Sequence, residues 1–147
     1  MLFIKRDQKI EFLKKVPMFS TLSNRHLLEI ARHTELVPVK PGEVLARQGA
    51  KGLEFFFIVD GKAQVQKNGK RIRQLTSGDF FGEISLIDQE PRTATVIADT
   101  DMTLLVVNKK SFDTLLDTVP DLQRKIILAL CKYVRRAEQP SSTELGL

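Results

Sequence analysis

The chain of 147 residues has the length of one domain, since single domains commonly contain about 100–200 residues. Its composition, 42% hydrophobic and 28% charged, is that of a globular protein and excludes a disordered or fibrous chain. The net charge of +5 fits an anionic ligand, a nucleic acid or a membrane surface, and it fits solubility alone equally well.

The apolar segments and the single cysteine bear on the location of the protein. The longest apolar run, Ile126 to Cys131, has six residues, so we expect no membrane span, which needs about 20. The first residues do not have the order of charged and apolar segments of a secretory signal. Because Cys131 has no second cysteine to pair with, we expect a cytoplasmic protein in which Cys131 is buried as a small apolar side chain.

The N-terminal part of the chain predicts two helices. The first covers Asp7 to Lys15 and ends before Pro17, and the second begins after Ser23, whose hydroxyl group is suited to cap it. His26 and His33 lie seven residues apart on the second helix, without the acidic or cysteine neighbours of a metal site. We therefore predict no metal.

Short β-rich runs alternate with glycine turns from residue 35 to residue 108. Asn68-Gly69 is typical of a two-residue hairpin turn, and strands at this spacing are typical of an antiparallel β-barrel or jelly roll. The runs that predict strands are Leu36–Val39, Val44–Arg47, Phe55–Val59, Ala63–Lys67, Ile72–Leu75, Thr93–Ala98 and Thr103–Asn108.

Helical periodicity returns in residues 109–138. Ser111 is suited to cap a helix that Pro120 ends, and a last helix runs to about Glu138. Its apolar stripe covers the barrel or forms the seam of a homodimer, and consists of Leu122, Ile126, Leu130 and Tyr133. The chain thus predicts an α+β, mainly β domain over residues 1–138, with helices in 1–34 and 109–138 and the barrel in 35–108. A flexible tail follows in 139–147.

The segment of residues 78–96 is longer than a connection between two strands requires, which is typical of a functional loop. A helix that begins after Gly82 offers the backbone N–H groups of Ile84 and Ser85 to an anion. The guanidinium of Arg92 can bind two phosphate oxygens at once. A carboxylate such as that of Glu83 would repel a neighbouring anion. Its place in an anion site is explained if it accepts a hydrogen bond from a sugar hydroxyl next to the phosphate.

Two runs carry a resemblance to a known family. Phe81-Gly82-Glu83-Ile84-Ser85-Leu86, followed by Pro91-Arg92-Thr93-Ala94-Thr95-Val96, closely resembles the phosphate-binding cassette of the cyclic nucleotide-binding domain. That family includes kinase regulatory subunits, gated channels and catabolite activator regulators. The resemblance covers nearly the whole chain and implies a β-barrel or jelly roll with N-terminal helices, a short cassette helix, and C-terminal hinge and lid helices.

The resemblance also implies the ligand contacts. The phosphate would be bound by Arg92, by the backbone of Ile84 and Ser85, and by Thr93, and the ribose by Glu83 and Gly82. Ser85 stands where alanine is frequent in the family, but its backbone amide remains. Threonine at the position of Thr93 is found both in family members that favour cyclic GMP and in some that favour cyclic AMP. Both ligands therefore stay open, with cyclic AMP preferred.

The last helix is where the resemblance implies a contact with the base. Tyr133, Arg135 and Arg136 are the candidates for it. Ordinary packing explains Tyr133 as well, and a solvated helix end suits the two arginines because cations are favourable at a helix C-terminus.

The resemblance implies a non-catalytic module that switches its C-terminal helices when it binds a cyclic nucleotide. The sequence contains no phosphate loop with lysine and no serine elbow, so we expect neither an enzyme nor a cofactor. We expect two kinds of partner, the cyclic nucleotide and either a second copy of the chain or an unidentified effector protein.

Two alternatives remain. One is a fragment of a transcription regulator without its DNA-binding part; the residues after Glu138 are too few for a helix-turn-helix, so we expect no direct contact with nucleic acid. The other is a degenerate, ligand-free interaction domain. A separate alternative for Arg92 alone is a surface ion pair with Glu83, Asp88 or Glu90.

Overall fold

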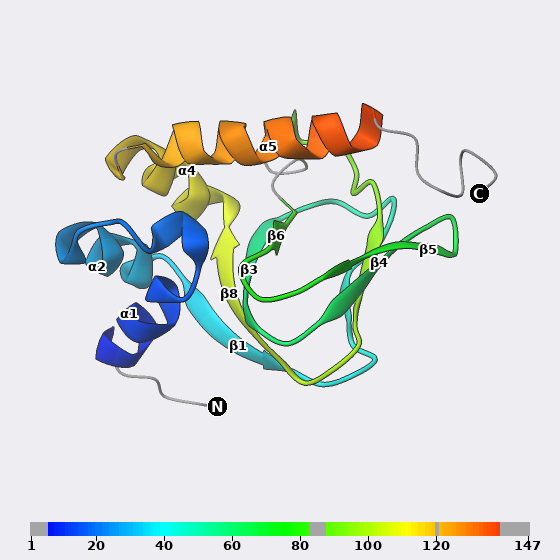
Figure 1. The fold of residues 1–147 in the computed structure, drawn as a ribbon, viewed down its shortest axis with the longest axis horizontal. Coiled ribbons are helices and arrows are strands. Elements are labelled where there is room, and N and C mark those ends of the chain that lie inside the picture. Colours follow the sequence, from blue (N-terminus) through cyan, green and yellow to red (C-terminus); the bar gives the residue numbers. More distant parts are fainter. Residues whose placement is uncertain (1–5, 83–87, 120, 139–147) are drawn as a thin grey trace.

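The strands of the chain form two antiparallel sheets, with helices packed at one end and across one side (Figure 1). The computed structural model describes residues 6–82, 88–119 and 121–138, apart from the side chains of residues 6–8, 17, 133, 137 and 138. The cassette residues Glu83, Ile84 and Ser85 and the predicted tail therefore lie outside the described residues.

The helices lie before and after the strands along the chain. The N-terminal elements are α1 (Arg6–Lys14), the 3-10 helix η1 (Pro17–Phe19) and α2 (Asn24–Arg32), and the C-terminal helices are α4 (Lys109–Thr118) and α5 (Leu122–Glu138). The strands are β1 (Glu35–Val39), β2 (Val44–Ala46), β3 (Glu54–Asp60), β4 (Ala63–Lys67), β5 (Lys70–Leu75), β6 (Phe80–Phe81), β7 (Thr95–Ala98) and β8 (Met102–Asn108).

Each sheet has four strands, in the orders β1-β8-β3-β6 and β2-β7-β4-β5. Every strand pair is antiparallel, which confirms the predicted mainly β fold with helices at both ends. Within the described residues no strand pairing joins the two sheets, so they form a jelly-roll sandwich rather than a closed barrel.

The hairpin turn predicted at Asn68-Gly69 connects β4 and β5. Both residues have positive φ, 53° and 78°, as a two-residue hairpin turn of this handedness requires. The side-chain amide of Gln48 holds the turn in place, since it donates to Asn68 Oδ1 over 2.9 Å and accepts from the Asn68 N–H over 2.8 Å. The hairpin is thereby fixed to the loop that follows β2.

Strand β3 separates two apolar cores and has buried side chains on both faces. Phe55, Phe57 and Val59 pack towards the helices, whereas Phe56 and Ile58 pack between the sheets. This alternation follows the two-residue period of a strand and explains why the run from residue 55 to residue 59 is continuously apolar. The ring centroid of Phe55 lies 5.0 Å from that of Phe112 on α4, so the core links the sheet to the C-terminal helices.

The residues that cap the helices confirm one prediction and correct another. Ser23 caps α2, because its Oγ accepts from the His26 N–H. Ser111, however, does not cap α4: the cap is Asn108, whose Oδ1 accepts from the Ser111 N–H over 2.8 Å. The side-chain carbonyl of the last residue of β8 already reaches the first turn, so the helix begins three residues earlier than the serine suggests.

Helix α5 is fixed to the N-terminal segment near its own start. Lys125 Nζ donates to Met18 O over 2.8 Å and to Thr21 Oγ1 over 3.0 Å. Leu122 and Ile126, each 3% exposed, pack in the core that also contains the N-terminal helices. The first turns of α5 are therefore held by both apolar and polar contacts.

One prediction about α5 is wrong, and one of the two roles left open for its apolar stripe is observed. The stripe begins with Leu122 and Ile126, which pack in the protein's own core. Cys131 is exposed rather than buried, because it lies on the side of the helix that faces away from this core. None of the helices in the described parts of the chain has the length and apolar content needed to cross a membrane.

Candidate functional site

Arg92 is the one charged side chain that is buried among the described residues, with 8% of its surface exposed. Its backbone is fixed between two residues of the β2–β3 loop, since its N–H donates to Ala50 O and its carbonyl accepts from the Gly49 N–H, both over 2.8 Å. Its Nη2 donates to Glu54 O over 2.9 Å, and its guanidinium carbon lies 5.6 Å from the centroid of the Phe56 ring. The side chain is thus held in one orientation.

Burial of a guanidinium carries a large desolvation cost unless other groups balance its charge. A surface ion pair with Asp88 or Glu90 does not fit, because Arg92 is buried whereas both carboxylate residues are exposed. A buried cation of this kind that also borders a cavity is suited to bind an anion.

Gly82 lies directly against Arg92. Its φ is +93°, and a Cβ atom at this position would lie 2.5 Å from Arg92 Nη1 and 2.7 Å from Glu54 O. Both the backbone conformation and the lack of space therefore require glycine here. The backbone that enters the cassette therefore lies directly against the guanidinium of Arg92, and the predicted contact of Gly82 with a ribose stays a prediction.

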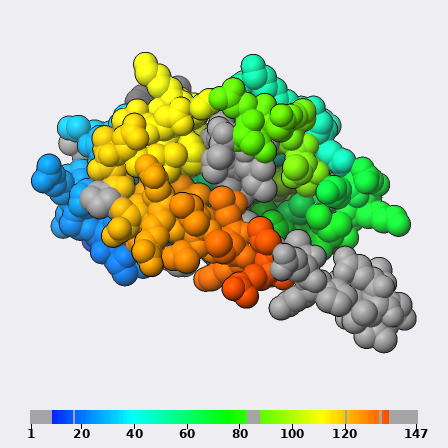
Figure 2. Space-filling view, turned by 90° about the horizontal axis from the view of Figure 1, so that it is seen from above, coloured from blue at the N-terminus to red at the C-terminus, as the bar shows by residue number. Residues whose placement is uncertain are grey.

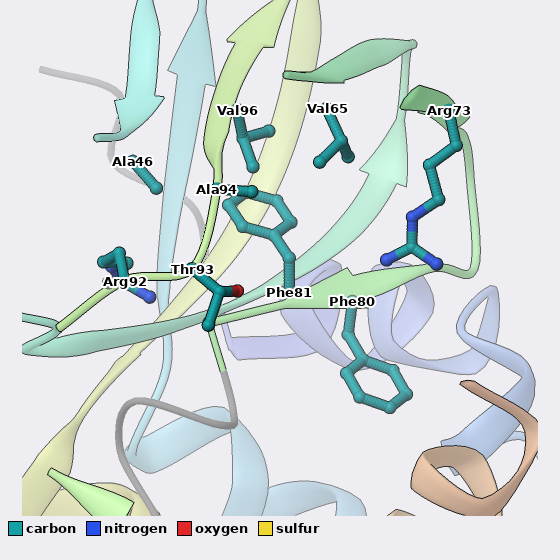
Figure 3. Close-up of a pocket in the computed structure, with 10 residues that line it drawn as sticks. Ala46, Val65, Arg73, Phe80, Phe81, Arg92, Thr93, Ala94 and Val96 are labelled. Carbon is teal, nitrogen blue, oxygen red and sulfur yellow. The ribbon is translucent and has the colours of Figure 1, made fainter. Parts of the chain in front are cut away.

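A cavity of about 90 Å³, open to solvent on one side, borders these residues (Figure 3). Arg92 and Thr93 lie on one side of Phe81 and Arg73 on the other. The wall between the two cationic ends is apolar. The described residues that line the cavity are Ala46, Val65, Arg73, Phe80, Phe81, Gly82, Arg92, Thr93, Ala94 and Val96.

The structure brings together those predicted site residues that it describes in the cassette, namely Gly82, Arg92 and Thr93. Arg135 and Arg136 are exposed near the end of α5 and are not among the described residues that line the cavity. The side chain of Tyr133 lies outside the described residues, so its predicted contact with the base stays a prediction.

Arg73 is a cavity residue that the sequence analysis did not identify. It lies on β5 opposite Val65 of β4, on the same face as the buried Leu75 two residues later. The alternation of the predicted strand Ile72–Leu75 contains this signal, because Arg73 and Leu75 must share a face. Arg73 shares the inward face of β5 with the buried Leu75, and this pattern indicates a polar side chain within an otherwise apolar cavity wall.

Clusters of metal ligands are absent from the parts of the chain that the structure describes, where no three His, Cys, Asp or Glu residues come together. His26 Nδ1 lies 3.0 Å from Ser23 Oγ, and His33 Nε2 lies 3.5 Å from Glu29 Oε1. The two histidines thus have separate surroundings.

The cyclic nucleotide-binding domain profile matches residues 36–119, which include both sheets apart from Glu35 and the whole of α4. The chain therefore belongs to the cyclic nucleotide-binding domain family.

Individual relatives of known name also support membership of this family. The chain is 41% identical over 113 residues to the cAMP-dependent protein kinase regulatory subunit of Schizosaccharomyces pombe, a match that covers 76% of this chain and 27% of that protein. It is 32% identical over 130 residues to isozyme 2 (forms cD5/T2) of the Drosophila melanogaster cGMP-dependent protein kinase, covering 83% of this chain and 14% of that one.

A solved structure of cAMP-bound PfPKA-R (141–441) superposes with a TM-score of 0.76 at 26% identity. The match covers 94% of this chain and 49% of that one. The chain thus spans about a quarter or less of the two curated relatives and half of the solved structure.

Proposed function

We propose that this chain is a non-catalytic regulatory module that binds cyclic AMP and transmits binding through its C-terminal helices. The observation that carries the proposal is the buried guanidinium of Arg92, held by Glu54 O at the wall of an open cavity and packed against Gly82. A cation in this position is suited to bind a phosphate that carries one negative charge.

The described residues divide the cavity by chemistry. Arg92 and the Thr93 hydroxyl provide the phosphate end, and Val65, Phe81 and Val96 provide an apolar wall for the flat face of a base. Glu83, Ile84 and Ser85 remain the predicted partners of the ribose and phosphate. The cavity of about 90 Å³ is smaller than the roughly 300 Å³ of common ligand sites, so a nucleotide would extend beyond it.

Cyclic AMP is the preferred ligand because the superposed structure is described as cAMP-bound and the yeast relative is a cAMP-dependent regulatory subunit. Cyclic GMP is the second candidate, and Arg73 favours it. A guanidinium pairs well with two acceptors side by side, as O6 and N7 of guanine offer them, whereas adenine presents an amino group beside N7.

The output of the module follows from how α5 is attached. Its first turns pack on the core through Leu122 and Ile126, and Lys125 ties it to Met18. A ligand that binds one arrangement of these helices more tightly than another shifts the population towards it. An effector protein that contacts the helices, in the cytoplasm, would receive the signal; the yeast relative is by name a subunit of a kinase.

Calorimetric titration of the 147-residue chain with cyclic AMP and with cyclic GMP tests the proposal. We expect saturable binding of at least one nucleotide, and a loss of about tenfold or more in affinity for Arg92→Ala, since a hydrogen bond to a charged group contributes about 1.5–3 kcal/mol. Arg71→Ala is the matched control, because Arg71 pairs with Asp99 on the surface.

The result that would contradict the proposal is a folded wild-type chain that binds neither nucleotide. Equal affinities for the wild type and Arg92→Ala would instead remove Arg92 from the phosphate site. In the first case the degenerate, ligand-free alternative would stand.

A further inference from the structure

Two chain segments that meet at the tip of the β4–β5 hairpin are strongly cationic. Residues 44–53 and 63–75 contain six Lys and Arg and no Asp or Glu, whereas the whole chain has a net charge of only +5. The two hydrogen bonds between Gln48 and Asn68 hold these segments together. The hairpin points away from the N-terminal helices (Figure 1), and in Figure 2 it lies, in green, at the outer edge of the described elements. The positive charge of the protein is therefore concentrated at this end.

Lys67 and Lys70 stand directly opposite each other where β4 pairs with β5. Like charges at opposite positions destabilise a sheet. Neither lysine, nor Arg47 in the adjacent loop, takes part in an ion pair between described residues, and all three are exposed. A local arrangement that costs stability, with no compensation among the described residues, is typical of a functional surface.

An exposed apolar side chain lies beside these cations. Ile72 is 55% exposed, and its neighbours Arg71 and Arg73 pair with consecutive residues of β4, so that Ile72 is the extra residue of a β-bulge. Bulges re-aim side chains and are frequent near functional sites. We give the name hairpin tip surface to the set Arg47, Lys67, Lys70 and Ile72.

We infer that the hairpin tip surface binds the anionic surface of a lipid bilayer. The three cations would lie at the head groups, and the side chain of Ile72 would enter the boundary between head groups and acyl chains. Each Lys or Arg near an anionic membrane raises the affinity by about fivefold, and an apolar side chain that enters the boundary adds to the binding.

Protection of the sheet edge explains only part of the pattern. Among the described strands β5 is the last of its sheet, and cations on an edge strand prevent its pairing with another chain. Lys67, however, lies on the inner strand β4, and Arg47 lies in a loop. Their charges need a different explanation, which an anionic surface provides.

The composition of the tip argues against two other occupants. Residues 44–53 and 63–75 contain no Phe, Tyr or Trp, the side chains on which the bases of a single-stranded nucleic acid stack. Lysine is depleted at protein interfaces, and a two-residue turn with four exposed side chains presents less than the roughly 800 Å² that each partner contributes to a standard interface. A bilayer is flat, so it can receive a small projecting tip.

Sedimentation with vesicles tests the inference. We expect the 147-residue chain to bind vesicles of equal parts phosphatidylserine and phosphatidylcholine at least about tenfold more tightly than vesicles of phosphatidylcholine alone. Raising the salt from about 0.1 M to about 1 M shortens the screening length from roughly 10 Å to roughly 3 Å and should release most of the protein. Equal binding to both kinds of vesicle would overturn the inference.

Matched variants identify the surface. The double variant Lys67→Ala/Lys70→Ala should bind the anionic vesicles at least about tenfold more weakly, since it removes two cations. It should remain folded in urea unfolding, because it also removes the repulsion between the two lysines. The control is Lys40→Ala/Lys110→Ala, which makes the same change in net charge at exposed positions after β1 and on α4. Equal losses would attribute binding to net charge and overturn the inference.

A tryptophan at position 72 reports whether the tip enters the lipid. The chain has no tryptophan, so the indole of Ile72→Trp would be the only one. On anionic vesicles its emission should shift to shorter wavelength, and brominated lipids should quench it. Ile127→Trp, at a 58% exposed position on α5, is the control and should respond several times less. An unchanged emission of Ile72→Trp in vesicle-bound protein would overturn the insertion of this side chain.

Soluble polyanions distinguish the bilayer from other anionic partners. Duplex DNA and polyglutamate should bind more weakly than anionic vesicles at the same concentration of negative charge. Ile72→Ser should weaken only the binding to vesicles, by several-fold. Binding to a polyanion as tight as that to vesicles would assign the surface to a nucleic acid or an acidic protein and overturn the inference. No cyclic nucleotide takes part, so these experiments and the ligand titrations succeed or fail independently.

Discussion

Gly82 and Arg92 are packed so closely that the two positions determine each other: a Cβ at Gly82 would lie 2.5 Å from Arg92 Nη1. The backbone that enters the cassette thus sets where the guanidinium stands, and the guanidinium in turn excludes every side chain from position 82. This pair forms the end of the cavity that we propose binds the phosphate.

Replacement of Gly82 by alanine should weaken ligand binding because the new methyl group displaces the guanidinium. We expect Gly82→Ala to lower the affinity for the preferred cyclic nucleotide by about tenfold or more in calorimetry. The free energy of unfolding should also fall by about 1–3 kcal/mol, since alanine is strained at a φ of +93°.

Gly42→Ala separates the two effects. Gly42 has a similar φ of +88°, but no atom lies within 4 Å of the position its Cβ would take. This control should lose stability in urea unfolding and keep the full affinity for the ligand. Wild-type affinity in Gly82→Ala would show that the contact with Arg92 has no role in binding.

Arg73 should affect the choice of base more than the binding of phosphate. We expect Arg73→Ala to reduce the affinity for cyclic GMP by about tenfold more than that for cyclic AMP, because a guanidinium that pairs with O6 and N7 discriminates by about 1–3 kcal/mol. Competition titrations of both nucleotides against a fluorescent analogue measure this ratio.

The control for Arg73 is again Arg71→Ala, two residues earlier on β5 and paired with Asp99 at 3.4 Å. It should leave the ratio of the two affinities unchanged. An equal loss for cyclic AMP and cyclic GMP in Arg73→Ala would mean that Arg73 contacts the phosphate or supports the fold and does not read the base.

Asn108, and not Ser111, should stabilise the start of α4. Asn108→Ala removes the acceptor of the Ser111 N–H and should lower the free energy of unfolding by about 1 kcal/mol. Ser111→Ala removes only a hydroxyl that lies 3.4 Å from His33 Nδ1 and should have a smaller effect. The reverse order of the two losses in urea unfolding would contradict the observed cap.

The elements that were predicted correctly depend on local interactions. The turn at Asn68-Gly69 follows from the positive φ that these two residues tolerate. The Ser23 cap follows from a hydroxyl group that stands three residues before His26 and accepts a hydrogen bond from its N–H. The run from residue 55 to residue 59 predicted a strand, and the structure shows that its continuous apolar character corresponds to a core on each face.

The wrong prediction that Cys131 is buried concerns the direction in which a side chain of α5 faces. The periodicity of α5 contains apolar residues on two sides, Leu122 and Ile126 on one and Ile127 and Cys131 on the other. Helical spacing alone does not say which side meets the core, because that depends on how α4 and the N-terminal helices pack. The burial of Leu122 and the exposure of Cys131 follow from this packing.

In the candidate site, too, the residues that are close together in sequence were predicted and a residue that is brought in by tertiary structure was not. The order of residues around Gly82, Arg92 and Thr93 was sufficient to predict an anion site and its family, and the family is confirmed. Arg73 was missed because it is distant from the cassette in sequence and reaches the cavity through the pairing of β4 with β5.

The sequence by itself determined the family, the strand-rich middle of the chain and the glycine and arginine of the cassette, because each depends on residues close together in the chain. The tertiary structure decided that two sheets form a sandwich, that Arg73 shares a cavity with Arg92, and which side of α5 remains exposed. These features depend on contacts between segments that are distant in the chain. The free energy that stabilises such contacts comes from removing whole apolar faces of sheets and helices from water, and it is gained only when these faces pack together.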